Sequence, residues 1–126
     1  MRNIRGLMPF LIIGTVLACW VAFPGDVFSQ GYPVRPITIY CGFSPGATTD
    51  VTARALASGA EKMLGVPVVI ENRDGGGSTV CAAVVASKNP DGYSLGVISS
   101  SALTIRPYFA KMAFDPLKDF TLLMAY

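Results

Sequence analysis

β-Strand patterns and α-helix patterns alternate along this sequence and are joined by short loops. The first strand is predicted over residues 37–41, where β-branched and aromatic residues alternate in a way that suits a partly buried strand. Further strands are predicted over 68–70, 94–99 and 120–126, and short helices over 78–87 and from Ala102, where Pro107 would interrupt the helix. Strands that alternate with helices in this way form parallel sheets with helices on their faces. The sequence therefore predicts an α/β fold with a parallel sheet and flanking helices.

The longest helix is predicted between the loop at residues 42–47 and Gly65. Thr48 or Thr49 is suited to cap its amino end, and Asp50 lies in the first turn, where the helix dipole favours a negative charge. Gly65 is placed to end the helix. Helical spacing predicts one apolar face, made of Ala53, Leu56, Ala60, Met63 and Leu64.

The first 29 residues have the order of charge and hydrophobicity that is typical of a secretory signal peptide. Two arginines, Arg2 and Arg5, precede an apolar run over residues 7–21. We expect cleavage after Ser29, which leaves residues 30–126 as a periplasmic domain. Lipid attachment at Cys19, which follows a small residue at the end of the run, is an alternative, and an uncleaved anchor is another, although the run is short for a bilayer span.

Charge and composition exclude several kinds of partner. Residues 30–126 carry eight basic and seven acidic side chains, 10 − 2 and 8 − 1, and this near-neutral balance argues against nucleic acid. The sequence has no histidine, and its cysteines and carboxylates lack metal-ligand spacing, so we expect neither a metal nor another cofactor. Cys41 and Cys81 lie in apolar surroundings and are expected to be free core residues, although export to an oxidising compartment leaves a disulfide open.

Three loops follow predicted strands, at the edge where open parallel sheets bind ligands. They cover residues 43–50, 72–78 and 99–101. In the first loop, Gly46 lets the backbone approach a ligand, and the following helix directs free N–H groups towards it, an arrangement that suits a carboxylate. An ordinary strand-to-helix turn would have the same pattern. The second loop has neither dinucleotide-binding glycine spacing nor a P-loop lysine, so a plain glycine turn is favoured there.

Residues 42–46 also match the G-x-S-x-G pattern of a hydrolase nucleophile elbow, with Ser44 in the position of the nucleophile. A serine nucleophile of this kind needs a general base, usually histidine, and the chain contains none. A serine α/β-hydrolase fragment is therefore the enzyme alternative, and it requires residues beyond Tyr126.

Five motifs stand in a fixed order between Tyr32 and about Phe120. They are YPVRPI at 32–37, FSPGATTD at 43–50, VVIENR at 68–73, PDGY at 90–93 and DPLKDF at 115–120. Taken together they resemble the substrate-binding receptors of the tripartite tricarboxylate transporter family, also called Bug receptors. Ala47 departs from the family pattern, where a second glycine is usual, and Asp74 stands where proline is usual.

The resemblance implies the first part of lobe 1 of a two-lobed periplasmic-binding-protein fold. Such a receptor is not an enzyme; it closes on a small organic acid, a di- or tricarboxylate or a related compound, and delivers it to membrane transporter subunits. The ligand-binding residues implied are Phe43, Ser44, Pro45, Gly46, Ala47, Asp50, Ser99, Ser100 and Ser101. Because no second lobe precedes the end at Tyr126, we expect a truncated chain, and a non-functional remnant is the third alternative.

Overall fold

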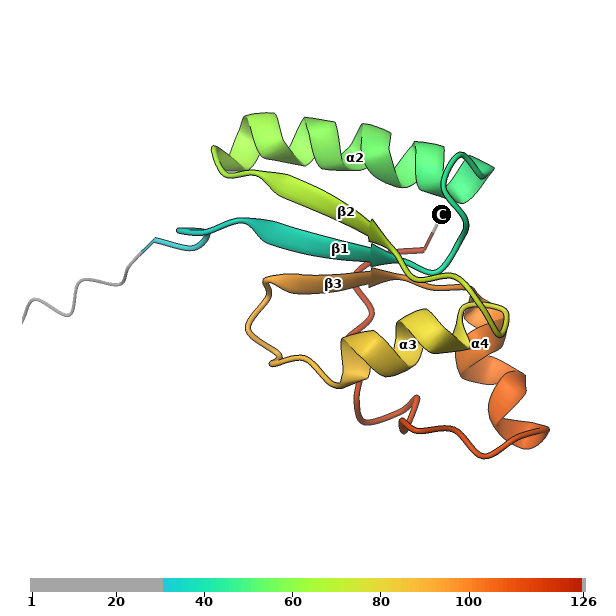
Figure 1. Ribbon diagram of the computed structural model, residues 1–126. Helices are drawn as coiled ribbons and strands as arrows, with labels where there is room; N and C mark the ends of the chain where they lie inside the picture. The colour runs from blue at the N-terminus through green and yellow to red at the C-terminus, as the bar shows by residue number, and fades with distance from the viewer. Residues whose placement is uncertain (1–30, 126) are drawn as a thin grey trace, which may run out of the picture. The chain divides into compact units, whose positions relative to one another are not determined.

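The computed structural model describes residues 31–125. Its elements in chain order are β1 (Ile37–Cys41), α2 (Thr48–Leu64), β2 (Val68–Asn72), α3 (Thr79–Ala86), β3 (Ser94–Val97), α4 (Ser100–Thr104) and the 3-10 helix η2 (Arg106–Tyr108) (Figure 1). The signal peptide predicted over residues 1–29, with Cys19, lies outside the described residues. Within residues 31–125, no helix has both the length and the apolar character needed to span a bilayer.

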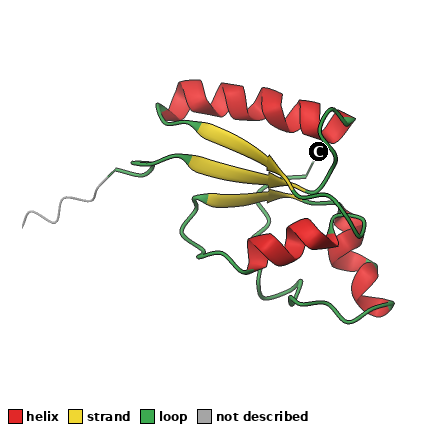
Figure 2. Cartoon of the chain, in the orientation of Figure 1, coloured by secondary structure: helices red, strands yellow, loops and turns green. Residues whose placement is uncertain are grey.

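The three strands form one parallel sheet in the order β2-β1-β3. Ile39 at the centre of β1 stands opposite Ile70 of β2 and Leu95 of β3. Helix α2 packs against β2, and α3 packs against β1 and β3, so that helices flank the sheet on two sides (Figure 2). The predicted α/β class with a parallel sheet is therefore confirmed.

Helix α2 begins at Thr48, but neither predicted threonine caps it. The capping position is Ala47, without a side-chain hydrogen bond to the helix. Instead, Oδ2 of Asp50 accepts a hydrogen bond from the backbone N–H of Gly46 at 2.9 Å. At the other end, Gly65 adopts the left-handed conformation (φ 69°) and its N–H donates to the carbonyl of Glu61, as predicted for a helix-ending glycine.

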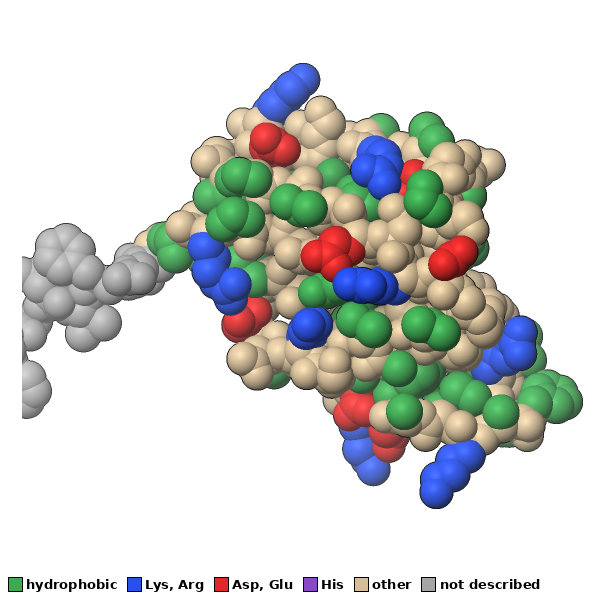
Figure 3. Space-filling model, viewed as in Figure 1, with side chains coloured by type: hydrophobic (Ala, Val, Ile, Leu, Met, Phe, Trp, Pro, Cys, Tyr) green, Lys and Arg blue, Asp and Glu red, His purple; other side chains and the backbone are tan. Residues whose placement is uncertain are grey.

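The prediction of the apolar face of α2 is wrong for its large residues. Leu56, Met63 and Leu64 are 46%, 88% and 41% exposed, whereas Ala53 and Ala57 are buried. The helix meets the sheet through a row of small side chains, which allows close approach but turns the larger ones aside. Hydrophobic side chains are accordingly visible on the surface in Figure 3.

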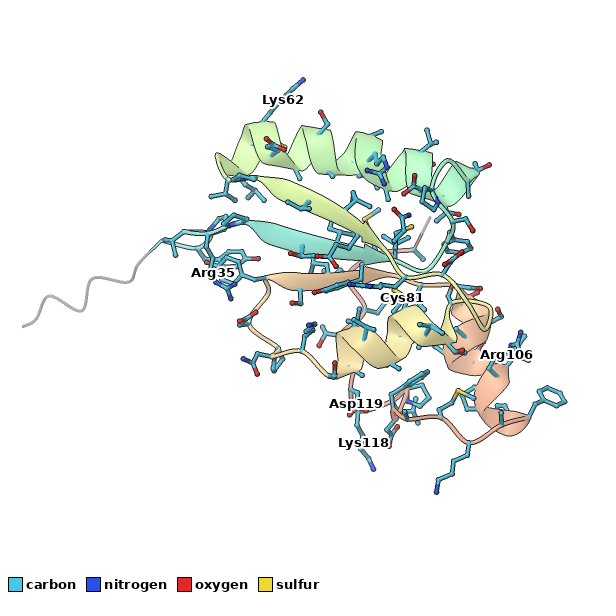
Figure 4. The ribbon with its side chains drawn as sticks, viewed as in Figure 1. Arg35, Lys62, Cys81, Arg106, Lys118 and Asp119 are labelled. Atoms are coloured by element: carbon cyan, nitrogen blue, oxygen red, sulfur yellow. The ribbon has the colours of Figure 1, made fainter. Side chains whose placement is uncertain are left out.

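The core of the described part contains two cysteines, Cys41 at the end of β1 and Cys81 in α3. Cys41 and Cys81 are fully buried and free, so the expectation of unpaired core cysteines is confirmed. The Cys81 thiol, labelled in Figure 4, donates to the carbonyl of Tyr40 at 3.3 Å. Burial raises the pKa of Cys81 to about 12, so its thiol stays protonated at neutral pH.

The segments after β3 match the predictions only in part. Helix α4 begins at Ser100, two residues before the predicted start, and the 3-10 helix that follows it contains Pro107. Residues 115–119 form the predicted turn, closed by a hydrogen bond from the N–H of Asp119 to the carbonyl of Asp115. The strand predicted over 120–126 is wrong for residues 120–125, which pair with no strand in the described part of the chain.

A cluster before β1 fixes the start of the sheet. The guanidinium of Arg35 lies 3.8 Å from the ring centroid of Tyr93 and pairs with Asp91 at 2.8 Å. Tyr32 donates to the carbonyl of Gly92, and the N–H of Val34 donates to the Tyr93 hydroxyl. The YPVRP and PDGY motifs thus contact each other at the amino ends of the strands.

Candidate functional site

Three loops meet at the carboxyl ends of the strands and enclose an open hollow of about 300 Å³. Its lining comes from the loop after β1 (Gly42, Phe43, Ser44), the loop after β2 (Asp74, Gly75, Gly77, Ser78) and the loop after β3 (Ser99, Ser101). Parallel pairing brings these segments together although they are about thirty residues apart in sequence. This hollow is the candidate binding site.

The floor of the hollow depends on the contact between Gly42 and Ser78. Ser78 is buried, and its hydroxyl donates to the carbonyl of Gly42 at 3.0 Å. A Cβ atom at Gly42 would lie 2.7 Å from both Cβ and Oγ of Ser78, which is too close for any side chain. Glycine at position 42 therefore lets the loop after β1 pack directly against the start of α3.

The loop before α3 has an unusual backbone conformation. Four consecutive residues have positive φ: Gly75 (123°), Gly76 (57°), Gly77 (64°) and Ser78 (73°). A positive φ in a residue with a side chain is unfavourable by roughly 1–3 kcal/mol and persists only where surrounding contacts hold it. The buried hydrogen bond from Ser78 to Gly42 is such a contact. Strain of this kind is concentrated at functional sites.

The polar groups of the hollow are serine hydroxyls and one carboxylate. Ser44 donates to Oδ2 of Asp74 at 2.7 Å, and the hydroxyls of Ser99 and Ser101 are 2.8 Å apart. Asp74 is the one charged side chain among the lining residues. Arg106, labelled in Figure 4, is not a lining residue of the hollow, but it lies close to one. Its Nη2 is 3.1 Å from the position that a Cβ of Gly77 would take.

The buried carboxylate of Asp50 holds the loop after β1 in place. Asp50 accepts hydrogen bonds from the N–H of Gly46 (2.9 Å), Nε of Arg54 (2.9 Å) and Nδ2 of Asn72 (2.7 Å). These donors, Arg54 first, hold the pKa of Asp50 well below its usual value, so it is ionised at neutral pH. We call these residues the Asp50 brace: Gly46, Asp50, Arg54 and Asn72.

The nine predicted ligand-binding residues divide into three groups. Four line the hollow: Phe43, Ser44, Ser99 and Ser101. Four belong to the same loops but not to the lining: Pro45, Gly46, Ala47 and Ser100. Asp50 is buried, and its carboxylate oxygens accept the hydrogen bonds of the Asp50 brace.

Five lining residues were not among the predicted ligand-binding residues: Gly42, Asp74, Gly75, Gly77 and Ser78. Four of them belong to the loop after the second strand, whose position at the ligand-binding edge was itself predictable from the strand order. The preference for a plain glycine turn there kept them out of the predicted set.

The features of a serine hydrolase do not extend beyond the G-x-S-x-G pattern. The hydroxyl of Ser44 is hydrogen-bonded to Asp74, and the sequence contains no histidine to act as base. In residues 31–125, no three side chains of the metal-binding types gather into a cluster.

Comparisons with known proteins all indicate one family. The model of the "Tripartite tricarboxylate transporter family receptor" matches residues 52–125. The "UPF0065 protein in gbd 5'region" of Cupriavidus necator is 38% identical over 98 residues, which are 78% of this chain and 30% of that protein. Protein BugT of Bordetella pertussis is 42% identical over 91 residues, 72% of this chain and 28% of that protein. The chain thus spans about 30% of the length of these relatives.

Solved structures show the same similarity in three dimensions. A periplasmic transporter structure superimposes with a TM-score of 0.64 at 34% identity, over 69% of this chain and 30% of the other. MatC from Rhodopseudomonas palustris, solved with bound malate, has a TM-score of 0.62 at 39% identity, over 71% and 31%. Another R. palustris protein, solved with adipate, has a TM-score of 0.51 at 35% identity, over 52% and 22%.

Proposed function

This chain belongs to the tripartite tricarboxylate transporter family of receptors, and from that premise we propose that it serves as an extracytoplasmic receptor that captures small organic acids. The residues described here would supply one wall of the binding cleft. The rest of a two-lobed receptor would supply the other wall and close on the ligand.

The observation that carries the proposal is the hollow at the carboxyl ends of the strands. It lies where parallel sheets bind ligands, and it is lined by four serines, three glycines, Phe43 and Asp74. Two related proteins were solved with the dicarboxylic acids malate and adipate. A small carboxylate is therefore the ligand class that suits both the site and its relatives.

A carboxylate could be bound here without a basic side chain. Ser99 and Ser101 line the hollow, and one of their two hydroxyl protons remains to donate to a ligand beyond the bond between them. The backbone around Gly77 leads into α3, whose amino end favours a negative charge. Hydrogen bonds from neutral donors to an ionised group are about twice as strong as those between neutral groups. We assign the contacts to Phe43, Ser44, Ser99 and Ser101, with Pro45, Gly46, Ala47 and Ser100 shaping the loops and Asp50 bracing the first of them.

The remaining parts of the proposal rest on the family. The receptor would be exported by the signal at residues 1–29, would act in the periplasm without catalysis, and would hand its ligand to membrane transporter subunits. The hydrolase alternative has no support from the comparisons, because the family model that matches is that of receptors.

Calorimetric titration of the protein at its native full length tests this function. We expect binding of one or more of malate, succinate, adipate and citrate, and no binding of the uncharged diamide of the same acid. Ser101→Ala should weaken binding on the order of tenfold, since it removes a hydrogen bond to a charged group. Ser58→Ala, on the exposed side of α2, is the matched control and should leave affinity unchanged. Binding of the diamide as tightly as the acid would contradict the proposal.

A further inference from the structure

Two Asp-Gly pairs occur in the sequence, Asp74-Gly75 beside the hollow and Asp91-Gly92 in the turn before β3. An aspartate followed by glycine can rearrange without an enzyme, because glycine has no side chain that keeps its backbone nitrogen away from the aspartate carboxyl. Both aspartates are exposed, and neither glycine N–H donates a hydrogen bond to an acceptor within residues 31–125. Sequence and exposure therefore do not distinguish the two pairs.

The carboxylate of Asp91 is held at both of its oxygens. Oδ2 accepts a hydrogen bond from Nη2 of Arg35 at 2.8 Å, and Oδ1 accepts one from the backbone N–H of Tyr93 at 3.0 Å. The neighbouring Gly92 is held as well, because its carbonyl accepts a hydrogen bond from the hydroxyl of Tyr32. Bonds to an ionised group are among the stronger hydrogen bonds, and they must break before Cγ of Asp91 can turn towards the glycine nitrogen.

The carboxylate of Asp74 is held at one oxygen. Ser44 donates to Oδ2 at 2.7 Å, whereas Oδ1 has no hydrogen-bond donor within residues 31–125. Three glycines follow Asp74, so that no side chain before Ser78 limits how the backbone approaches the carboxyl group. The carboxyl group of Asp74 therefore has fewer contacts to break than that of Asp91 before it can meet the next backbone nitrogen.

We propose that Asp74 is a site of spontaneous isoaspartate formation, whereas Asp91, in the same Asp-Gly sequence, is protected by its contacts. In the first step, the backbone nitrogen of Gly75 bonds to Cγ of the protonated Asp74 carboxyl. The amide hydrogen and the carboxyl hydroxyl leave together as one water, and a succinimide ring closes. One water then adds to the ring. If it breaks the bond from nitrogen to Cγ, aspartate returns; if it breaks the bond from nitrogen to the main-chain carbonyl carbon, the chain continues through Cγ as isoaspartate.

Isoaspartate at position 74 changes the wall of the hollow. The backbone gains one methylene group, and the free carboxylate becomes attached directly to Cα. Asp74 and Gly75 both line the hollow, and the hydrogen bond from Ser44 depends on the length of the original side chain. The rearrangement therefore breaks a contact between the loops after β1 and β2. It requires water and no ligand, so it goes beyond the proposed function and does not depend on it.

Ageing the protein at its native full length in mildly acidic buffer tests the proposal. Proteolysis followed by electron-transfer fragmentation distinguishes isoaspartate from aspartate, and its amount at both positions is followed over weeks. We expect isoaspartate to form at Asp74 about tenfold or more faster than at Asp91, the ratio that corresponds to one additional hydrogen bond with a charged group. The same protein in concentrated urea is the control, because the contacts are lost there and the two rates should become similar.

A pair of variants separates the effect of the contacts from that of the sequence. Arg35→Ala releases Oδ2 of Asp91 and should speed isoaspartate formation there, while the rate at Asp74 stays unchanged. Lys118→Ala is the matched control, since it removes another exposed ion pair, with Asp115, and should alter neither rate. Equal rates at the two aspartates of the folded protein, or a faster rate at Asp91, would overturn the proposal. An unchanged rate at Asp91 in Arg35→Ala would overturn the protection by contacts.

Discussion

The side-chain amide of Asn72 donates a hydrogen bond to Oδ1 of Asp50 at 2.7 Å and joins the end of β2 to the first turn of α2. The same nitrogen donates to the carbonyl of Phe43 at 2.9 Å. One residue of the VVIENR motif therefore holds the loop that borders the hollow. The motif therefore positions the site, whereas Asp74 and Gly75, which follow the motif, line the hollow itself.

The Asp50 brace makes the fold sensitive to acid. The pKa of Asp50 is lower in the folded chain than its unfolded value of about 4, so the stabilisation that it provides is present above pH 4 and is lost as the pH falls below it. Asp50→Asn should lower the free energy of unfolding at pH 7, because its amide would face the donors of Arg54 and Asn72. The variant should also lose less stability than the unchanged protein as the pH falls below 4. Urea denaturation at pH 7 and pH 3 measures both effects. Glu61→Gln is the control, and an equal acid dependence in Asp50→Asn and the unchanged protein would refute the brace.

The variant Gly42→Ala, which adds one methyl group, should be less stable than the unchanged protein. Its Cβ would collide with Ser78, and overpacking of this kind destabilises a fold by about 1–3 kcal/mol. Gly59→Ala is the matched substitution, because nothing lies within 4 Å of a Cβ there and alanine is favoured in a helix by about 0.5–1 kcal/mol. Thermal denaturation should therefore shift in opposite directions for the two variants. Equal stability of the two would show that the contact between Gly42 and Ser78 is not as close as described.

The cluster around Arg35 should affect stability but not binding. It lies at the amino ends of the strands, whereas the hollow lies at their carboxyl ends. Arg35→Ala removes an exposed ion pair and a cation–π contact, which together contribute about 1 kcal/mol. We expect a small decrease in melting temperature and an unchanged dissociation constant in the calorimetric assay. A tenfold loss of affinity would mean that this end of the sheet takes part in ligand binding.

Much of the fold could be predicted because its signals are local. The alternation at residues 37–41 and the glycine at position 65 specify a strand and a helix end by themselves. The errors concern features that depend on distant contacts. Thr48 does not cap α2, and Asp50 in the first turn instead holds the loop after β1 through partners up to 22 residues away. Residues 120–125 have the composition of a strand but lack a neighbour within the described part of the chain.

The candidate site was predictable at the level of loops but not of side chains. Strand order alone placed the three loops at one edge of the sheet. Whether a polar residue in such a loop faces the hollow or the interior depends on the tertiary arrangement, and Asp50 turned inward while Asp74 turned outward. The positive φ of Ser78 could not be inferred from sequence, because serine rarely adopts it.

A crystal structure of the full-length protein with its bound acid tests the central claim most directly. The account predicts a ligand carboxylate in the hollow, with an oxygen within about 2.7–3.2 Å of the hydroxyl of Ser99 or Ser101. A ligand bound elsewhere, for example in the larger opening beside Ser58 and Pro67 where α2 ends and β2 begins, would contradict it.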